Sequence, residues 1–222
     1  MKSKGLPKIV SEKKFRSAVE KFRTKEKQNT RERDRLSAKR RRLPMMEVRG
    51  DYLFEGPEGQ RTLLDLFEGR RQLVVYHFMY HRKDDTFCKG CSFVGDQIPH
   101  LAHLHARGVS LVMTSHAPLK SIRRHKKRMG WDTPWYSGVK DSFNQDLGID
   151  GDREHVLSVF IREGKKVYRT YYTGSRGVEY LGTPWAFLDI TPWGRQEKWE
   201  DSPKGWPQTD MYTWWNFHDE YK

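Results

Sequence analysis

The sequence contains only two cysteines among its 222 residues, Cys88 and Cys91. Without a second cysteine pair, the chain lacks the usual second half of a structural zinc site. It also lacks an apolar N-terminal segment of the signal-peptide type, and no apolar run approaches the roughly 20 residues that cross a bilayer. We therefore expect a cytoplasmic protein, in a reducing compartment that suits thiols which cycle between oxidation states.

Positive charge is concentrated in the first 44 residues, which hold 17 Lys and Arg against 5 Asp and Glu, whereas the remaining residues hold 25 against 24. Thinly spaced apolar residues from Phe15 to Leu36 predict one long exposed helix with a narrow apolar stripe, closed by Pro44. The cluster of residues 39–42 would suit nucleic acid or another anionic surface. The stripe instead favours packing on the chain's own domain or on a second subunit, so nucleic acid is not the expected partner.

From residue 47 onward, the predicted strands and helices alternate. The apolar runs and turn signals indicate, in chain order, a strand over residues 72–80, a helix over 91–107, a strand over 109–114, a helix after Pro118 and a hairpin from strands over 156–161 and 167–172. This order is typical of an α/β protein with a thioredoxin-like three-layer fold and a central mixed sheet.

The composition divides the chain into three parts. Residues 1–46 form the basic helical arm, 47–191 the thioredoxin-like domain, and 192–222 an aromatic C-terminal extension with five tryptophans. Tryptophans in such number seldom stay in water, so we expect the extension to pack on the domain or on a partner subunit. A homodimer that buries both the arm and the extension follows as an expectation.

The spacing of the two cysteines indicates redox chemistry. A helix that begins at or just after Cys88 places both sulfurs on one face, within reach of a disulfide. The helix N-terminus and Lys89 favour a thiolate, so Cys88 is the predicted nucleophile and Cys91 the resolving thiol. Phe87 is expected to shield the sulfur, and Gly90 to leave room for a tight turn. Thiol-disulfide exchange of this kind needs no cofactor.

A metal site is the alternative interpretation of the pair. Its candidate additional ligands are His77, His81, His100 and His103. His77 lies inside an apolar run, which is also typical of a hydrogen-bonded core histidine. The residues considered for lining a substrate cleft are His77, Trp131, Trp135 and Leu157.

Several stretches resemble the bacterial family called domain of unknown function 899, almost from end to end. They are Lys25-Glu26-Lys27, residues 40–44, 51–57 and 72–79, Cys88-x-x-Cys91-Ser92, residues 128–131, Phe143-Asn144-x-Asp146, Arg176-Gly177, residues 188–192 and 194–197. The resemblance implies a thioredoxin-like fold and a predicted dithiol-disulfide oxidoreductase. The expected partners are a protein or small-molecule disulfide and a reducing system.

The chain departs from two better-understood relatives of that fold. Thioredoxins carry a cis-proline before the strand of the later hairpin, but residues 153–157 contain no proline. Peroxiredoxins carry a threonine or serine three positions before the cysteine, where this chain has Asp85. Thiol-disulfide exchange is therefore the predicted activity. A thiol peroxidase, and a non-catalytic module that binds a metal or an anionic partner, remain as alternatives.

Overall fold

The two strongest apolar runs form the centre of the sheet. In the computed structural model, which describes residues 6–138 and 142–221, they become strands β4 (Gln72–His77) and β7 (Val109–Ser115). The two strands pair in parallel, with Leu73 opposite Ser110 and His77 opposite Thr114. Their mainly apolar residues suit strands that are covered on both faces.

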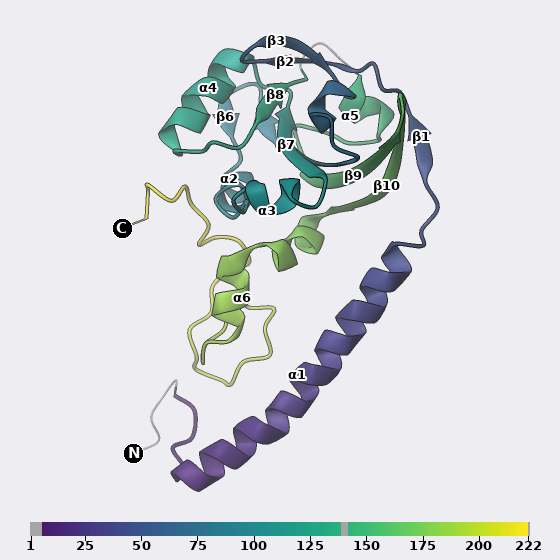
Figure 1. Cartoon of the computed structure of the whole chain (residues 1–222). Helices are drawn as coiled ribbons and strands as arrows, with labels where there is room; N and C mark the ends of the chain where they lie inside the picture. Colours follow the sequence, from purple (N-terminus) through teal and green to yellow (C-terminus); the bar gives the residue numbers. More distant parts are fainter. Residues whose placement is uncertain (1–5, 139–141, 222) are drawn as a thin grey trace.

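Within the described residues, eight strands form one mixed sheet in the order β1-β10-β9-β4-β7-β8-β2-β3 (Figure 1). The hairpin of β9 (Val156–Glu163) and β10 (Lys166–Gly174) lies antiparallel on the other side of β4. A parallel pair with a helical connection, extended by an antiparallel hairpin, has the strand order of a thioredoxin-like fold. The predicted fold class is confirmed. The other strands are β1 (Met46–Val48), β2 (Leu53–Gly56), β3 (Gly59–Thr62), β8 (Trp135–Ser137) and, in a separate ladder, β5 (Tyr80–His81) and β6 (Thr86–Phe87).

Helices precede, connect and follow these strands. They are α1 (Glu12–Arg40), α2 (Lys89–Gly95), α3 (Ala102–His105), α4 (Leu119–Arg128), α5 (Phe143–Asp146), α6 (Thr183–Asp189) and the 3₁₀ helices η1 (Asp65–Phe67) and η2 (Ser175–Leu181). The prediction of one continuous helix over residues 91–107 is wrong, because α2 ends at Gly95 and α3 begins only at Ala102. Pro99 lies in this break, and proline disfavours helical geometry both at its own position and at the residue before it.

The alternation of side chains along β4 divides the core between the two faces of the sheet. Leu73 and Val75 belong to one apolar cluster, together with Phe143. Tyr76 belongs to a second cluster, which also contains Cys91. The second cluster thereby fixes the first turn of α2 against the sheet.

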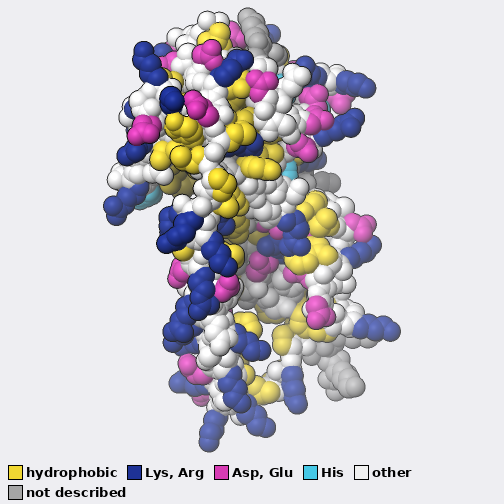
Figure 2. Space-filling model, turned by 90° about the vertical axis from the view of Figure 1, so that its right-hand side faces the viewer, with side chains coloured by type: hydrophobic (Ala, Val, Ile, Leu, Met, Phe, Trp, Pro, Cys, Tyr) yellow, Lys and Arg dark blue, Asp and Glu magenta, His cyan; other side chains and the backbone are white. Residues whose placement is uncertain are grey.

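The helix α1 differs from the rest of the chain because none of its side chains is buried. It runs away from the domain (Figure 1), and Lys and Arg side chains gather along it in the lower half of Figure 2. Exposed apolar residues, among them Phe15, Val19 and Phe22, lie between the charges. The helix therefore buries no apolar stripe against its own domain. No helix of the described residues is both long and apolar enough to span a membrane.

A buried polar network lies behind β4 and explains its histidine. The His77 Nδ1 lies 2.8 Å from the Asn144 Oδ1, and its Nε2 lies 2.9 Å from the Ser158 Oγ. Burial lowers the pKa of His77 to about 3, so the ring is neutral. Its Nδ1–H therefore donates to Asn144, and its Nε2 accepts the Ser158 hydroxyl proton. The same Ser158 oxygen accepts a hydrogen bond of 3.0 Å from Arg169.

Replacing Ser158 by alanine removes the shared partner of His77 and Arg169. The loss should lower the free energy of unfolding by about 2 kcal/mol, because two buried polar groups lose a hydrogen bond. Urea unfolding of Ser158→Ala measures the loss, and Ser17→Ala on the exposed face of α1 is the matched control. Equal midpoints for the two variants would show that the network contributes no net stability.

Trypsin should cleave α1 before it cleaves the domain, since the helix is exposed and rich in Lys and Arg. Mass spectrometry of a short digestion should find cuts within residues 13–42 and an intact remainder. Protection of α1 equal to that of the domain would contradict this expectation. It would instead indicate that a second chain covers the helix, and light scattering would then give the mass of the dimer.

Candidate active site

The cysteine pair lies where the β5-β6 ladder ends and α2 begins. Cys88 is the N-cap residue of α2 and has an extended backbone, and Cys91 follows in the first helical turn. The Cys88 Sγ accepts a hydrogen bond from the Cys91 backbone N–H at 3.5 Å. Because the first N–H groups of a helix have no partner within it, this sulfur takes the place of a capping oxygen. Both cysteines are free thiols here.

Several neighbours stabilise the thiolate of Cys88. Its pKa is lowered to about 6, chiefly by the hydrogen bond with the Cys91 side chain. The backbone N–H groups of Cys91 and Gly90 and the charge of His81 lower the pKa further, whereas partial burial raises it. At neutral pH, Cys88 is therefore mostly a thiolate, which is the nucleophilic form of cysteine.

Cys91 is the buried member of the pair. Only 1% of its surface is exposed, and this burial raises its pKa well above the usual value. The neighbouring Cys88 raises the pKa further, whereas the Met79 backbone N–H, 3.5 Å from the Cys91 Sγ, acts in the opposite direction. One cysteine is thus ionised and partly exposed while the other is protonated and covered. This difference suits a nucleophile and a resolving thiol.

Cys88 opens into a cavity of about 1150 Å³. The cysteine turn forms one wall, and the others come from α4, η2, α6 and the C-terminal residues. Most of this surface is apolar. Its aromatic and aliphatic side chains include Met79, Phe87, Val94, Val178, Trp185, Met211, Trp215 and Phe217.

Phe87 and His125 support the first turn of α2 from behind. Their rings stack at 4.5 Å. Ser92 donates a hydrogen bond of 3.1 Å to the Cys88 carbonyl oxygen, and its Oγ lies 3.0 Å from the His125 Nε2. Burial lowers the pKa of His125 to about 4, so the neutral ring donates its Nε2–H to Ser92. The chain of contacts holds the reactive turn in one position.

The two residues between the cysteines serve other purposes than the sequence predicts. Lys89 is not among the groups that lower the pKa of Cys88. Its ammonium instead lies 3.9 Å from Glu220 and over the ring of Phe217. At Gly90, a Cβ atom would come within 2.8 Å of the Trp215 ring. Position 90 therefore requires glycine because the Trp215 ring leaves no room for a side chain, in addition to any requirement of the turn.

None of the four residues considered as cleft lining belongs to the cavity of Cys88, so this prediction is corrected. His77 faces the buried network with Asn144, and Trp135 is 99% buried within the second core cluster. Trp131 packs on the far side of α2 and donates its indole N–H to Asp96, and Leu157 packs against the second core cluster. Trp131, Trp135 and Leu157 thus belong to the packing of the second cluster, and His77 lies on the other face of the sheet.

His155 belongs to the segment 153–157, which contains no proline. It precedes β9 and lines the cavity. Its Nε2 lies 3.4 Å from the Ser175 carbonyl oxygen, and burial lowers its pKa. The peptide bonds of the described residues are all trans. An imidazole therefore lines the same cavity as Cys88, from the segment that precedes β9.

Two buried carboxylates anchor the segment that follows α6. Glu179 binds Arg195 at 2.5 Å. Glu197 accepts hydrogen bonds from the indole N–H groups of Trp199 and Trp214, at 2.5 Å and 2.8 Å. These contacts bring the C-terminal residues back to the cavity.

Sequence reasoning missed the C-terminal residues as part of the site. Met211, Tyr212, Trp215 and Phe217 line the cavity although they lie more than 100 residues after Cys91. The concentration of tryptophans was the available signal. It predicts burial, but it does not indicate which surface is covered.

The histidines considered as metal ligands do not gather around the cysteines. His77 lies in the sheet, and His100 and His103 lie next to each other at α3 with their rings 6.0 Å apart. His81 is close enough to Cys88 to affect its pKa. Across residues 6–138 and 142–221, no group of three or more His, Cys, Asp or Glu side chains is arranged to hold a metal ion.

Solved structures similar to this chain include three bacterial peroxiredoxins. Peroxidoxin BcpB from Mycobacterium tuberculosis is 14% identical over 64% of this chain and 95% of its own, with a TM-score of 0.48. Peroxiredoxin Q from Xanthomonas campestris is 14% identical over 68% and 98%, with a TM-score of 0.48, and PrxQ from Xylella fastidiosa is 13% identical over 65% and 97%, with a TM-score of 0.47. The strand order, rather than these scores, identifies the fold.

No curated protein matches the chain significantly. A family model described as "Bacterial protein of unknown function (DUF899)" matches residues 4–221, which is nearly the whole chain. The match includes the basic arm, the cysteine turn and the C-terminal segment. The chain therefore belongs to this bacterial family of proteins of unknown function.

Proposed function

We propose that the protein is a dithiol-disulfide oxidoreductase. The observation that carries this proposal is the asymmetry of the cysteine pair at one helix end. Cys88 has a pKa of about 6 and faces a cavity, whereas Cys91 is buried with a raised pKa. A structural pair would not need a stabilised thiolate that opens onto a large apolar cavity.

The reaction proceeds in two exchanges. The Cys88 thiolate attacks one sulfur of the substrate disulfide, whose S–S bond breaks, and the second substrate sulfur leaves as a thiolate that takes a proton from water. Cys91 then loses its proton and attacks the Cys88 sulfur in the mixed disulfide. The remaining substrate sulfur leaves and is protonated, and an internal Cys88–Cys91 disulfide forms. Two electrons have passed to the substrate, and an external thiol reductant must restore the pair.

Peroxide reduction is less well supported as a second candidate. The position three residues before Cys88 carries Asp85, whose carboxylate is held by Arg124 at 2.8 Å and by the hydroxyls of Tyr80 and Ser121, each at 2.7 Å. The Asp85 carboxylate thus stands where a peroxiredoxin carries a hydroxyl group. It also pairs with the Arg124 guanidinium. Hydrogen peroxide should therefore oxidise Cys88 more slowly than a disulfide does.

Substitution of each cysteine separates their roles. Cys88→Ser should lower kcat/KM for a small disulfide by more than about 1000-fold, because the nucleophile is lost. Cys91→Ser should still complete the first exchange and should accumulate a mixed disulfide on Cys88, visible by mass spectrometry. Full activity of Cys88→Ser together with an inactive Cys91→Ser would reverse the assignment, and two inactive variants without any mixed disulfide would refute it.

Alkylation by iodoacetamide should reveal the low pKa of Cys88. Because the thiolate is the reactive form, the rate should rise with pH, reach half its maximum near the pKa of about 6 and level off above it. Below this pH, protonation removes the nucleophile. Only one of the two thiols should react in the folded protein, since Cys91 is buried. A midpoint at the ordinary thiol pKa of about 8.5 would contradict the stabilised thiolate.

A further inference from the structure

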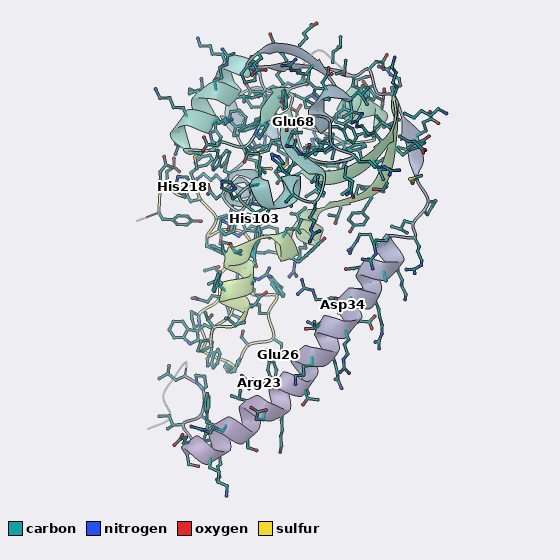
Figure 3. All side chains as sticks on the ribbon, in the orientation of Figure 1. Arg23, Glu26, Asp34, Glu68, His103 and His218 are labelled. Carbon is teal, nitrogen blue, oxygen red and sulfur yellow. The ribbon has the colours of Figure 1, made fainter. Side chains whose placement is uncertain are left out.

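The last residues of the described chain return to the two helices that flank Cys88. Arg128, at the end of α4, donates to both carboxylate oxygens of Asp219 at 2.8 Å and to Glu220 at 2.8 Å. His218, labelled in Figure 3, lies 2.8 Å from Asp96 at the end of α2. The chain end is thus attached to both α2 and α4. We refer to residues 211–220 as the C-terminal strap.

Aromatic contacts hold the strap close to the cysteines. The Phe217 ring packs edge-on against His125 at 5.4 Å, with the Arg128 guanidinium 4.6 Å from its centre. Trp215 stacks on Phe93 at 5.6 Å and leaves no space for a Cβ at Gly90. These rings cover the turn between the two cysteines, so a substrate has to approach Cys88 beneath the strap.

The size and surface of the cavity restrict what can reach the sulfur. A volume of about 1150 Å³ is slightly above the roughly 300–1,000 Å³ of typical small-molecule sites, and it is far smaller than a folded domain. Its walls are mostly apolar, with aromatic rings from Phe87, Trp185 and Trp215. Such walls favour a compact substrate with an aliphatic or aromatic body.

We propose that the site takes a low-molecular-weight disulfide with a mainly apolar body, an inference that rests on the proposed thiol-disulfide exchange. The C-terminal strap excludes folded protein disulfides. The substrate is reduced to two free thiols, with the electron pair supplied by Cys88 and Cys91 as described above. The ion pairs of Asp219 and Glu220 hold the strap in the covering position. Loss of these pairs uncovers the cysteine turn to larger substrates.

A single-turnover experiment on the full-length reduced protein tests this proposal. Dithiodipyridine, a neutral aromatic disulfide, and insulin, a protein disulfide, serve as the two substrates. The rate at which the protein reduces each substrate is divided by the rate at which dithiothreitol reduces the same substrate. This ratio corrects for the different intrinsic reactivities of the two disulfides. For the unmodified protein, the normalised rate with dithiodipyridine should exceed that with insulin by about 100-fold, a ratio expected when access needs a minor open conformation.

The double variant Asp219→Asn/Glu220→Gln releases the strap without changing any residue that lines the cavity. It should raise the normalised insulin rate by about tenfold and leave the dithiodipyridine rate within about twofold. Asp201→Asn/Asp210→Asn is the matched control, because it removes the same two charges from the C-terminal segment without affecting Arg128. It should change neither rate. Arg128→Ala removes the other half of the ion pairs and should raise the insulin rate as well.

Equal normalised rates for insulin and dithiodipyridine in the unmodified protein would overturn the proposal. It would also fail if the strap variants left the insulin rate unchanged, or if the control raised it equally. A different result would count against the underlying thiol-disulfide exchange. In that case, either substrate would oxidise the thiols of the unmodified protein no faster than those of Cys88→Ser. The two failures are therefore distinguishable.

Discussion

The hydrogen bonds between Cys91 and the Cys88 sulfur determine the ionisation of the cysteine pair. They exist because Cys88 occupies the N-cap of α2, where the helix leaves its first amide groups without partners. A thiolate satisfies these donors better than a neutral thiol, which lowers the pKa of Cys88. The buried Cys91 contributes its side chain to the same stabilisation and thereby stays protonated. The asymmetry of the pair thus follows from one local geometry.

The geometry of that turn is held from several sides. Ser92 and His125 fix the turn from the interior, and the second core cluster buries Cys91. Trp215 closes it from outside, over Gly90. The Trp215 ring occupies the space that Gly90 leaves free for want of a side chain. The buried network around His77 stabilises the sheet on the other face, without contact with the cavity.

The C-terminal segment gives the site its shape. Buried carboxylates at Glu179 and Glu197 anchor it through arginine and indole donors, and Arg128 holds its end. A buried charged group is stable only when it is paired or hydrogen-bonded, and both carboxylates meet this condition. The arm differs, since α1 carries exposed ion pairs and has no buried side chain.

The sequence alone determined the order of the central strands and the place of the cysteine turn, because apolar periodicity, glycine and proline act locally. The family followed from the resemblance of its motifs, and the family model confirms it. The sequence also predicted a stabilised thiolate at Cys88, since a cysteine at a helix start meets the helix amides directly. Only the tertiary structure decided which residues surround Cys88. His77 and Trp135 belong to the core rather than the cleft, while Met211, Trp215 and Phe217 come from a segment without periodicity. Long-range packing depends on the shapes of distant surfaces, which local patterns do not encode.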